Sequence, residues 1–276
     1  IDAAKTVFAY ERDNQRLLVA TVVDDSIVAF NNRRLYNEYK EFLNRNLPIT
    51  ECPLDTICGM QVIHNADASI SIDQQEYIEK KASMYGCDIK GSKILSPMCA
   101  QYKLDTRPEM PDPKMITYAR EIMGSLIYAT LTRPECKYAC SKLSTVVTNP
   151  TEKDLRAMER VLQYLYNSRT TKLTYRAGPW RGPDGAIHDI IEPDAYVDAS
   201  FAQEVGRRSQ TGFAVLLAGA AIYCKSGKQT QVTDSTGYAE TVALHEASNW
   251  VVVFRNTLKK MLPSAPLKIR SDPTLI

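Results

Sequence analysis

The sequence predicts a protein of mixed α/β (α+β) architecture. Three observations support this prediction: short apolar runs flank Asp24-Asp25, a helix-forming stretch occupies the middle, and short strands precede a long helix in the last third. The composition, 44% hydrophobic and 24% charged, is typical of globular proteins. A chain of 276 residues is long enough for two domains or three small ones.

The first hundred residues alternate between predicted strands and helices. The apolar run at 17–23 ends in Asp24-Asp25 and resumes at 27–30, which indicates two strands joined by an acidic turn. Pro48 and Gly86 then mark the ends of two helices. The remaining expected elements are a helix at 36–47, a hairpin formed by 57–63 and 69–72, and a helix at 74–85.

The middle of the chain is predicted to be helical. A proline-rich segment around 97–113 marks the first candidate domain boundary, and helical character follows from 117 to 167. Thr151 and Asp154 have the spacing of a capping box at the start of the last of these helices. Apolar residues recur along that helix at helical spacing: Leu155, Met158, Val161, Leu162 and Leu165.

The last third is predicted to be a sheet with one covering helix. After a linker at 177–185, strands are expected at 195–201, 212–218 and 220–224, then a helix at 235–261 and a strand at 267–272. Because a helix precedes the final strand, we expect that strand to run parallel to a neighbour.

Three carboxylates of this last third are expected to converge at one end of the sheet. Alternation places Asp198 on the face opposite Val197. Glu240 is expected on the helix stripe that faces the sheet, three residues before Ala243, and Asp272 ends the last strand. Clustered like charges need a cation to persist, and an oxygen-only ligand set favours Mg²⁺ or Mn²⁺. The alternative is that all three are ordinary solvated acids.

Charge and cysteine usage restrict the function classes. The formal net charge is only +2, so contacts with nucleic acid must come from local basic patches. Seven scattered cysteines indicate reduced thiols rather than a disulfide framework, so we expect an intracellular protein that is not secreted. Cys136 and Cys140 are more typical of buried small side chains than of a zinc site. No apolar run is long enough for a membrane span, so no membrane partner is expected.

Short motifs of the last third resemble the RNase H domain of copia-type LTR-retrotransposon polyproteins. They are residues 195–200 (Ala-Tyr-Val-Asp-Ala-Ser), 206–213 (Gly-Arg-Arg-Ser-Gln-Thr-Gly-Phe), 221–229 (Ala-Ile-Tyr-Cys-Lys-Ser-Gly-Lys-Gln) and 235–247, which contains Glu240. Earlier segments resemble the same polyproteins in the same order. They are 22–25 (Val-Val-Asp-Asp), 77–80 (Tyr-Ile-Glu-Lys), 124–128, 132–134, 149–151 and 160–165.

The resemblance implies three parts. Residues 1–103 would be the C-terminal part of a reverse transcriptase palm and thumb, 104–188 a helical connection segment, and 189–276 an RNase H-like domain that is truncated at its C-terminus. The implied fold is a partial polymerase palm, then the helical segment, then an RNase H-like mixed sheet with a flanking helix. The missing N-terminal polymerase segment of the parent polyprotein would be a partner.

The resemblance also implies an enzyme that cleaves the RNA strand of RNA/DNA hybrids. Asp198, Glu240 and Asp272 would be catalytic and would hold Mg²⁺ (or Mn²⁺). Four basic residues would lie on turns near the site and contact phosphates: Arg207, Arg208, Lys225 and Lys228. Their alternative is a solvated basic surface.

In the palm, Asp24 and Asp25 would be a vestigial polymerase metal site, because a third palm aspartate is absent and the polymerase half is incomplete. Two competing interpretations remain. One is a catalytically dead retroelement remnant that only binds nucleic acid or a partner segment. The other is an unrelated α/β magnesium phosphohydrolase.

Overall fold

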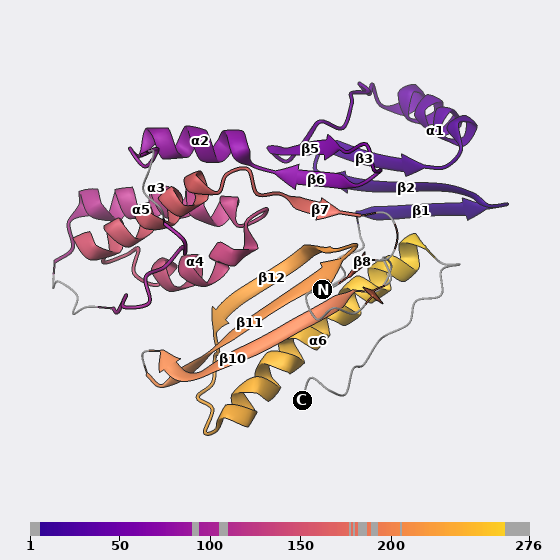
Figure 1. Ribbon diagram of the computed structural model, residues 1–276. Coiled ribbons are helices and arrows are strands. Elements are labelled where there is room, and N and C mark those ends of the chain that lie inside the picture. The colour runs from indigo at the N-terminus through magenta and orange to yellow at the C-terminus, as the bar shows by residue number, and fades with distance from the viewer. Residues whose placement is uncertain are drawn as a thin grey trace.

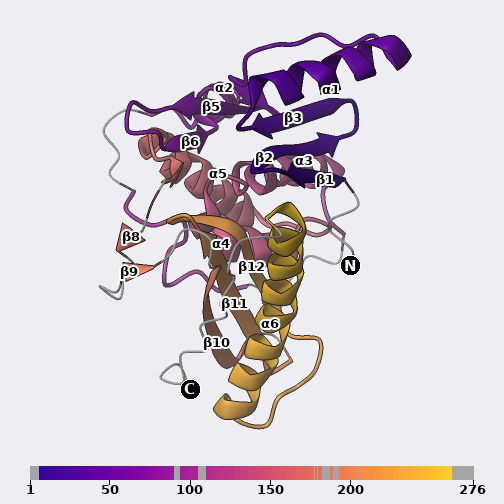
Figure 2. The ribbon, with the colours of Figure 1, turned by 90° about the vertical axis from the view of Figure 1, so that its right-hand side faces the viewer.

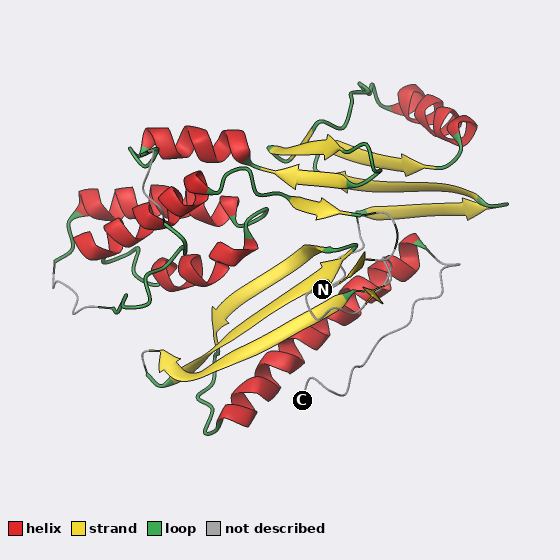
Figure 3. Cartoon of the chain, viewed as in Figure 1, coloured by secondary structure: helices red, strands yellow, loops and turns green. Residues whose placement is uncertain are grey.

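The computed structural model describes residues 6–89, 94–104, 110–176, 178, 180–181, 187–188, 193–204 and 206–262. In these ranges the chain is a mixed α+β protein with small antiparallel sheets. Figure 1 shows the helices α2 to α5 gathered on one side, beside the sheets. Figure 3 shows that one long helix lies apart from that group, along the C-terminal strands.

The N-terminal sheet is an antiparallel meander. It has the order β1 (Val7–Arg12), β2 (Gln15–Val22) and β3 (Asp25–Phe30), and α1 (Arg33–Asn46) follows it. Leu17 and Val19 of β2 are buried together with Tyr36 of α1. The Asn32 side chain accepts hydrogen bonds from two backbone amides of the first helical turn, which fixes where α1 begins. The predicted pair of strands with its acidic turn is confirmed.

The second sheet joins two distant parts of the chain. It has the order β4 (Thr56–Ile57), β5 (Met60–His64), β6 (Ile70–Asp73) and β7 (Leu173–Tyr175), all antiparallel. The predicted hairpin corresponds to β5 and β6. A hydroxyl–hydroxyl hydrogen bond of 2.9 Å links Ser71 to Thr174 across the sheet. The sheet therefore anchors the segment that leaves the helical bundle.

The helical bundle contains the largest core. Its members are α2 (Gln75–Met84), α3 (Pro113–Ala129), the 3-10 turn η1 (Pro134–Cys136), α4 (Lys137–Ser144) and α5 (Glu152–Asn167). Side chains of all of them share one apolar cluster, in which Cys136 and Cys140 are buried, as predicted for small hydrophobic residues. The capping box of Thr151 and Asp154 is present at the start of α5. α2 packs in this core although the predicted boundary assigns it to the preceding part.

The C-terminal sheet is a three-stranded antiparallel meander covered by one helix. Its order is β10 (Asp194–Glu204), β11 (Arg208–Leu217) and β12 (Ala220–Lys228), and a short pair, β8 (Trp180–Arg181) with β9 (Ile187–His188), precedes it. Helix α6 (Thr236–Met261) lies along the sheet (Figure 2). Ala218 and Gly219 have φ values of 54° and 85° in the two-residue turn between β11 and β12, a geometry that suits a tight hairpin.

The predicted strands and long helix of the last third are confirmed, with strands that extend further than the apolar pattern indicated. The expected final strand at 267–272 lies outside the described residues, and the described part of this sheet is entirely antiparallel. None of the helices in the described ranges combines the length and the hydrophobicity that crossing a bilayer requires.

Candidate functional site

The two faces of the C-terminal sheet differ in character. Phe213 and Val215 of β11 pack with Ala247 of α6 in a buried cluster. Tyr223 of β12 stacks on Trp250 of α6 with ring centroids 4.2 Å apart. Strand alternation places the intervening residues on the opposite face, so that face is the one available for a site.

Asp198 lies on the face of the sheet opposite α6. Val197, its neighbour in β10, packs against the buried cluster under α6, and Asp198 itself is exposed. It pairs with Gly212 of β11, and its carboxylate forms no ion pair or side-chain hydrogen bond within the described ranges. The predicted orientation of Asp198 is therefore confirmed.

Glu240 does not occupy the buried helix stripe, so the expectation that it faces the sheet is wrong. Ala239, Ala243 and Ala247 form that stripe, and Glu240 is exposed beside it in the first turns of α6. At 100° per residue, a residue four positions before Ala243 lies closer to its direction than one three positions before. The small Ala239 takes the packed position, and the larger acid flanks it.

The predicted third carboxylate, Asp272, lies outside the described residues. Within the described ranges, no three His, Cys, Asp or Glu side chains are placed to hold one metal ion. Within those ranges β10 also has a single neighbouring strand, β11, so its other edge is unpaired there. This edge is open to the expected final strand, which ends in Asp272.

A buried polar network fixes the start of α6 on the sheet, and sequence reasoning missed it. The Gln229 amide donates to the Thr211 hydroxyl at 3.1 Å and to the Ala239 carbonyl at 2.8 Å. Ser209 and Thr233 exchange a second buried hydrogen bond of 2.7 Å. Buried polar groups that are satisfied in this way define one packing arrangement, so the network determines where the first turn of α6 and Glu240 lie.

The four predicted phosphate contacts have different surroundings. Arg207 and Arg208 are exposed at the turn between β10 and β11, as expected. Lys228 ends β12 on the Asp198 face by alternation. Lys225 is not on a turn: it lies within β12, and its ammonium forms a salt bridge with Glu246 of α6. The expectation for Lys225 is wrong in this respect, because its side chain is on the helix-covered face.

Asp24 and Asp25 are exposed at the turn between β2 and β3. The preceding residue, Val23, has a φ of 57° and is 94% exposed. A positive φ is strained for a β-branched residue, and strained backbone of this kind is concentrated at functional sites. A positive φ is also the geometry of tight two-residue hairpins such as the one at Ala218 and Gly219, so it does not distinguish a functional turn from an ordinary hairpin loop.

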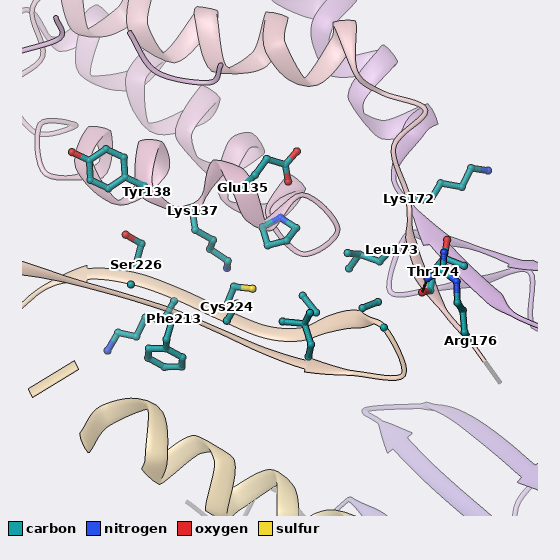
Figure 4. Close-up of a pocket in the computed structure, with 18 residues that line it drawn as sticks. Glu135, Lys137, Tyr138, Lys172, Leu173, Thr174, Arg176, Phe213, Cys224 and Ser226 are labelled. Carbon is teal, nitrogen blue, oxygen red and sulfur yellow. Dashed lines mark hydrogen bonds between the residues drawn. The ribbon is translucent and has the colours of Figure 1, made fainter. Parts of the chain in front are cut away.

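A pocket of about 570 Å³ opens on the same face of the sheet as Asp198. Its walls come from η1 and α4, from β7 and from β11 and β12. Figure 4 shows Lys137 of α4 extending toward the strand that carries Cys224, with α6 on the far side of that strand. No pattern in the sequence predicted this pocket, since its walls come from three separate segments.

Comparison with known proteins finds distant similarity to transposon proteins. It is 29% identical over 224 residues to the putative transposon Ty5-1 protein of Saccharomyces cerevisiae, covering 77% of this chain and 66% of that protein. It is 24% identical over 269 residues to the retrovirus-related Pol polyprotein from transposon RE1 of Arabidopsis thaliana, covering 95% and 17% respectively.

The chain is a distant relative of retrotransposon Pol polyproteins. It spans about a sixth of the RE1 polyprotein and just under two thirds of the yeast protein. A 145-residue stretch is also 30% identical to the secreted RxLR effector protein 161 of Plasmopara viticola, covering 51% of this chain and 94% of that protein. No family model matches the chain, and no solved structure does.

The match to the RE1 Pol polyprotein extends over both candidate sites. It covers 95% of the chain and so leaves out only about 14 residues in total. Such a stretch necessarily includes Asp24, Asp25, Asp198 and Glu240. The acidic turn and the C-terminal sheet therefore belong to one segment that corresponds to a continuous part of a Pol polyprotein.

Proposed function

We propose that this chain is a reverse transcriptase and RNase H segment of a retrotransposon polyprotein, and that its C-terminal sheet cleaves the RNA strand of RNA/DNA hybrids. The observation that supports this most is the position of Asp198. Its carboxylate is exposed on the face of the sheet opposite the one that α6 covers. A substrate as wide as a duplex can reach an acid in such a position.

The acids in the described ranges suit a divalent cation. Neither Asp198 nor Glu240 forms an ion pair there, so both carboxylates are free to act as ligands. Oxygen-only ligand sets favour Mg²⁺ or Mn²⁺. Asp272, the third acid of the proposal, would come from the expected strand at the unpaired edge of β10.

Each residue has a stated part in the proposed reaction. Asp198 and Glu240 would hold the cation, which would supply an activated water and stabilise charge on the scissile phosphate. Because α6 lies on the face opposite Asp198, the two carboxylates would have to meet around the edge of β10 that is unpaired in the described ranges. Arg207 and Arg208, at the exposed turn, hold phosphates of the hybrid. The start of α6 keeps Glu240 at a constant position relative to the sheet, because the Gln229 side chain donates hydrogen bonds to both Thr211 and Ala239.

The acidic turn at Asp24 and Asp25 is proposed to be the remaining half of a polymerase metal site. The match to a Pol polyprotein, which extends over this turn, supports this proposal. Two carboxylates alone form an incomplete cage for phosphoryl transfer, which needs a further ligand. We therefore expect no DNA synthesis by this chain on a primed RNA template. Primer extension that Asp24→Asn abolishes would contradict this expectation.

A labelled RNA/DNA hybrid tests the nuclease. Purified chain should cleave the RNA strand in Mg²⁺ or Mn²⁺ and not after chelation by EDTA, and it should leave a DNA duplex of the same sequence intact, because selection depends on 2′-hydroxyls and groove width. Hybrid binding without cleavage in either metal would instead support the catalytically dead remnant. Cleavage that continues in EDTA would refute the metal-dependent proposal.

A further inference from the structure

The pocket between α4 and β12, here called the α4–β12 cleft, concentrates positive charge. Three basic side chains and one acidic side chain line it from this face, whereas the whole chain has 34 basic and 32 acidic residues. The basic members are Lys137, Lys172 and Arg176, and the acid is Glu135; Lys225 also lines the cleft, but its ammonium lies on the α6 face. This composition indicates an anionic ligand.

Two of the lining cations, Lys137 and Arg176, form no salt bridge within the described ranges. Hydrogen bonds from Ser69 lower the pKa of the Asp67 carboxyl, and Arg176 lies close enough to help lower it. Lys172 pairs with Asp73 at 3.2 Å, and Lys225 pairs with Glu246. The single acid of the lining does not neutralise Lys137 or Arg176, because the Glu135 carboxylate binds the buried Arg133 guanidinium at 2.6 Å. Lys137 and Arg176 are therefore the groups that would meet an anion.

The walls of the cleft are held together by hydrogen bonds between β7 and the β11–β12 hairpin. The Tyr175 hydroxyl donates to the Ala221 carbonyl at 2.8 Å, and the Arg176 amide donates to the Ala218 carbonyl at 2.8 Å. On the opposite wall, Lys137 follows directly after η1, which Arg133 anchors. Lys137 and Arg176 thus project from two fixed walls, so little backbone conformational entropy would be lost when a ligand binds.

The rim and the position of the cleft favour a nucleic-acid strand over a small anion. Tyr138 lines the cleft, is 43% exposed and has its ring in contact with the Lys142 ammonium, and basic grooves with exposed aromatic rings suit single strands of nucleic acid. Gly212 and Ser226 line the cleft, and Gly212 pairs with both Ser226 and Asp198. One strand spacing, about 5 Å, therefore separates Asp198 from Gly212, and two spacings, about 10 Å, separate it from Ser226.

We propose that the α4–β12 cleft binds the phosphodiester backbone of the nucleic-acid strand that passes Asp198, with Lys137 and Arg176 as the phosphate contacts. This proposal rests on the proposed function, because it assigns the cleft to the same substrate. Neither residue is needed for chemistry at Asp198. They determine affinity and the direction in which the strand leaves the sheet.

Fluorescence anisotropy of a labelled RNA/DNA hybrid, in EDTA and over a series of salt concentrations, tests the cleft independently of cleavage. The double variant Lys137→Glu/Arg176→Glu should bind more weakly than the unmodified chain. Its slope of log affinity against log salt should be smaller by about two, one for each lost phosphate contact. The matched control is Lys80→Glu/Lys114→Glu, which reverses two exposed lysines outside the cleft.

Equal affinity for the hybrid in the cleft variant and the unmodified chain would overturn the proposal. An equal loss of affinity in the control variant would also overturn it, because the effect would then come from net charge and not from the cleft. If the charge-reversal variant does not fold, Lys137→Gln takes its place. This substitution should lower the slope of log affinity against log salt by about one. If the unmodified chain cleaves no hybrid but the cleft variant still loses affinity, the cleft proposal is supported and the nuclease proposal is refuted. Unchanged affinity in a chain that cleaves refutes only the cleft.

Discussion

Removing the Arg133 side chain should destabilise the helical bundle more than almost any other single polar change. The Arg133 side chain is 1% exposed and joins η1 to the end of α5. Its guanidinium donates to the Ser168 carbonyl at 2.9 Å and to the Ser168 hydroxyl at 2.6 Å. Hydrogen bonds from charged donors contribute about 1.5–3 kcal/mol each, so two of them give about 3–6 kcal/mol. The Glu135 pair adds little, because its carboxylate is 38% exposed.

We therefore expect Arg133→Ala to lower the free energy of unfolding by about 3–5 kcal/mol. Urea unfolding followed by circular dichroism should show a midpoint lower by about 1 M or more, given slopes of about 1–3 kcal/mol per M. Peptide-resolved hydrogen exchange should show the loss first in η1, α4 and the end of α5.

The matched control for this prediction is Arg156→Ala. Arg156 is on the surface of α5, 67% exposed, and pairs with Glu152 one turn away. Such exposed pairs contribute about 0.3–0.5 kcal/mol. A midpoint shift for Arg133→Ala no larger than that of Arg156→Ala would refute the reasoning that the buried guanidinium organises this part of the bundle.

Three further predictions concern the bundle. Thr151→Ala removes the capping box of α5 and should lower stability by about 1 kcal/mol in the same urea assay. Hydrogen bonds from Gln75, then Arg169, lower the pKa of Glu79, so this carboxylate stabilises the fold above its ordinary pKa of 4.5 and the contribution is lost as pH falls through the lowered value. The unmodified chain should therefore have a higher Tm than Glu79→Gln, and this difference in Tm should shrink below about pH 4.5. Burial raises the pKa of Cys140 to about 12, so iodoacetamide should label it only after unfolding, in contrast to the exposed cysteines, as peptide mass spectrometry would show.

Much of the fold follows from local patterns. The capping box of Thr151 and Asp154, the acidic turn after β2 and the alternation around Asp198 each depend on residues a few positions apart, and the structure contains all three. β7 could not be predicted in this way. It has three residues and pairs with β6 about a hundred positions earlier, so its formation depends on where α5 ends.

The site was predicted only in part, for the same physical reason. Alternation orients Asp198 correctly because both faces of a strand are defined by its own sequence. Lys225 finds its partner, Glu246, on a helix 21 residues away, and no periodicity indicates that pairing. The cleft cations Lys137 and Arg176 come together only through tertiary packing of α4 and β7 against the sheet.

The most direct test of the central proposal is the Asp198→Asn substitution in the hybrid cleavage assay, with binding and cleavage scored separately. The substitution removes a cation ligand and a negative charge that faces the phosphates. Cleavage in Mg²⁺ should therefore be lost, and hybrid binding in EDTA should be unchanged or slightly tighter. Asp88→Asn, an exposed acid of the helical part, is the control and should cleave normally. Cleavage that survives Asp198→Asn would contradict the account, because the nuclease site would then lie elsewhere.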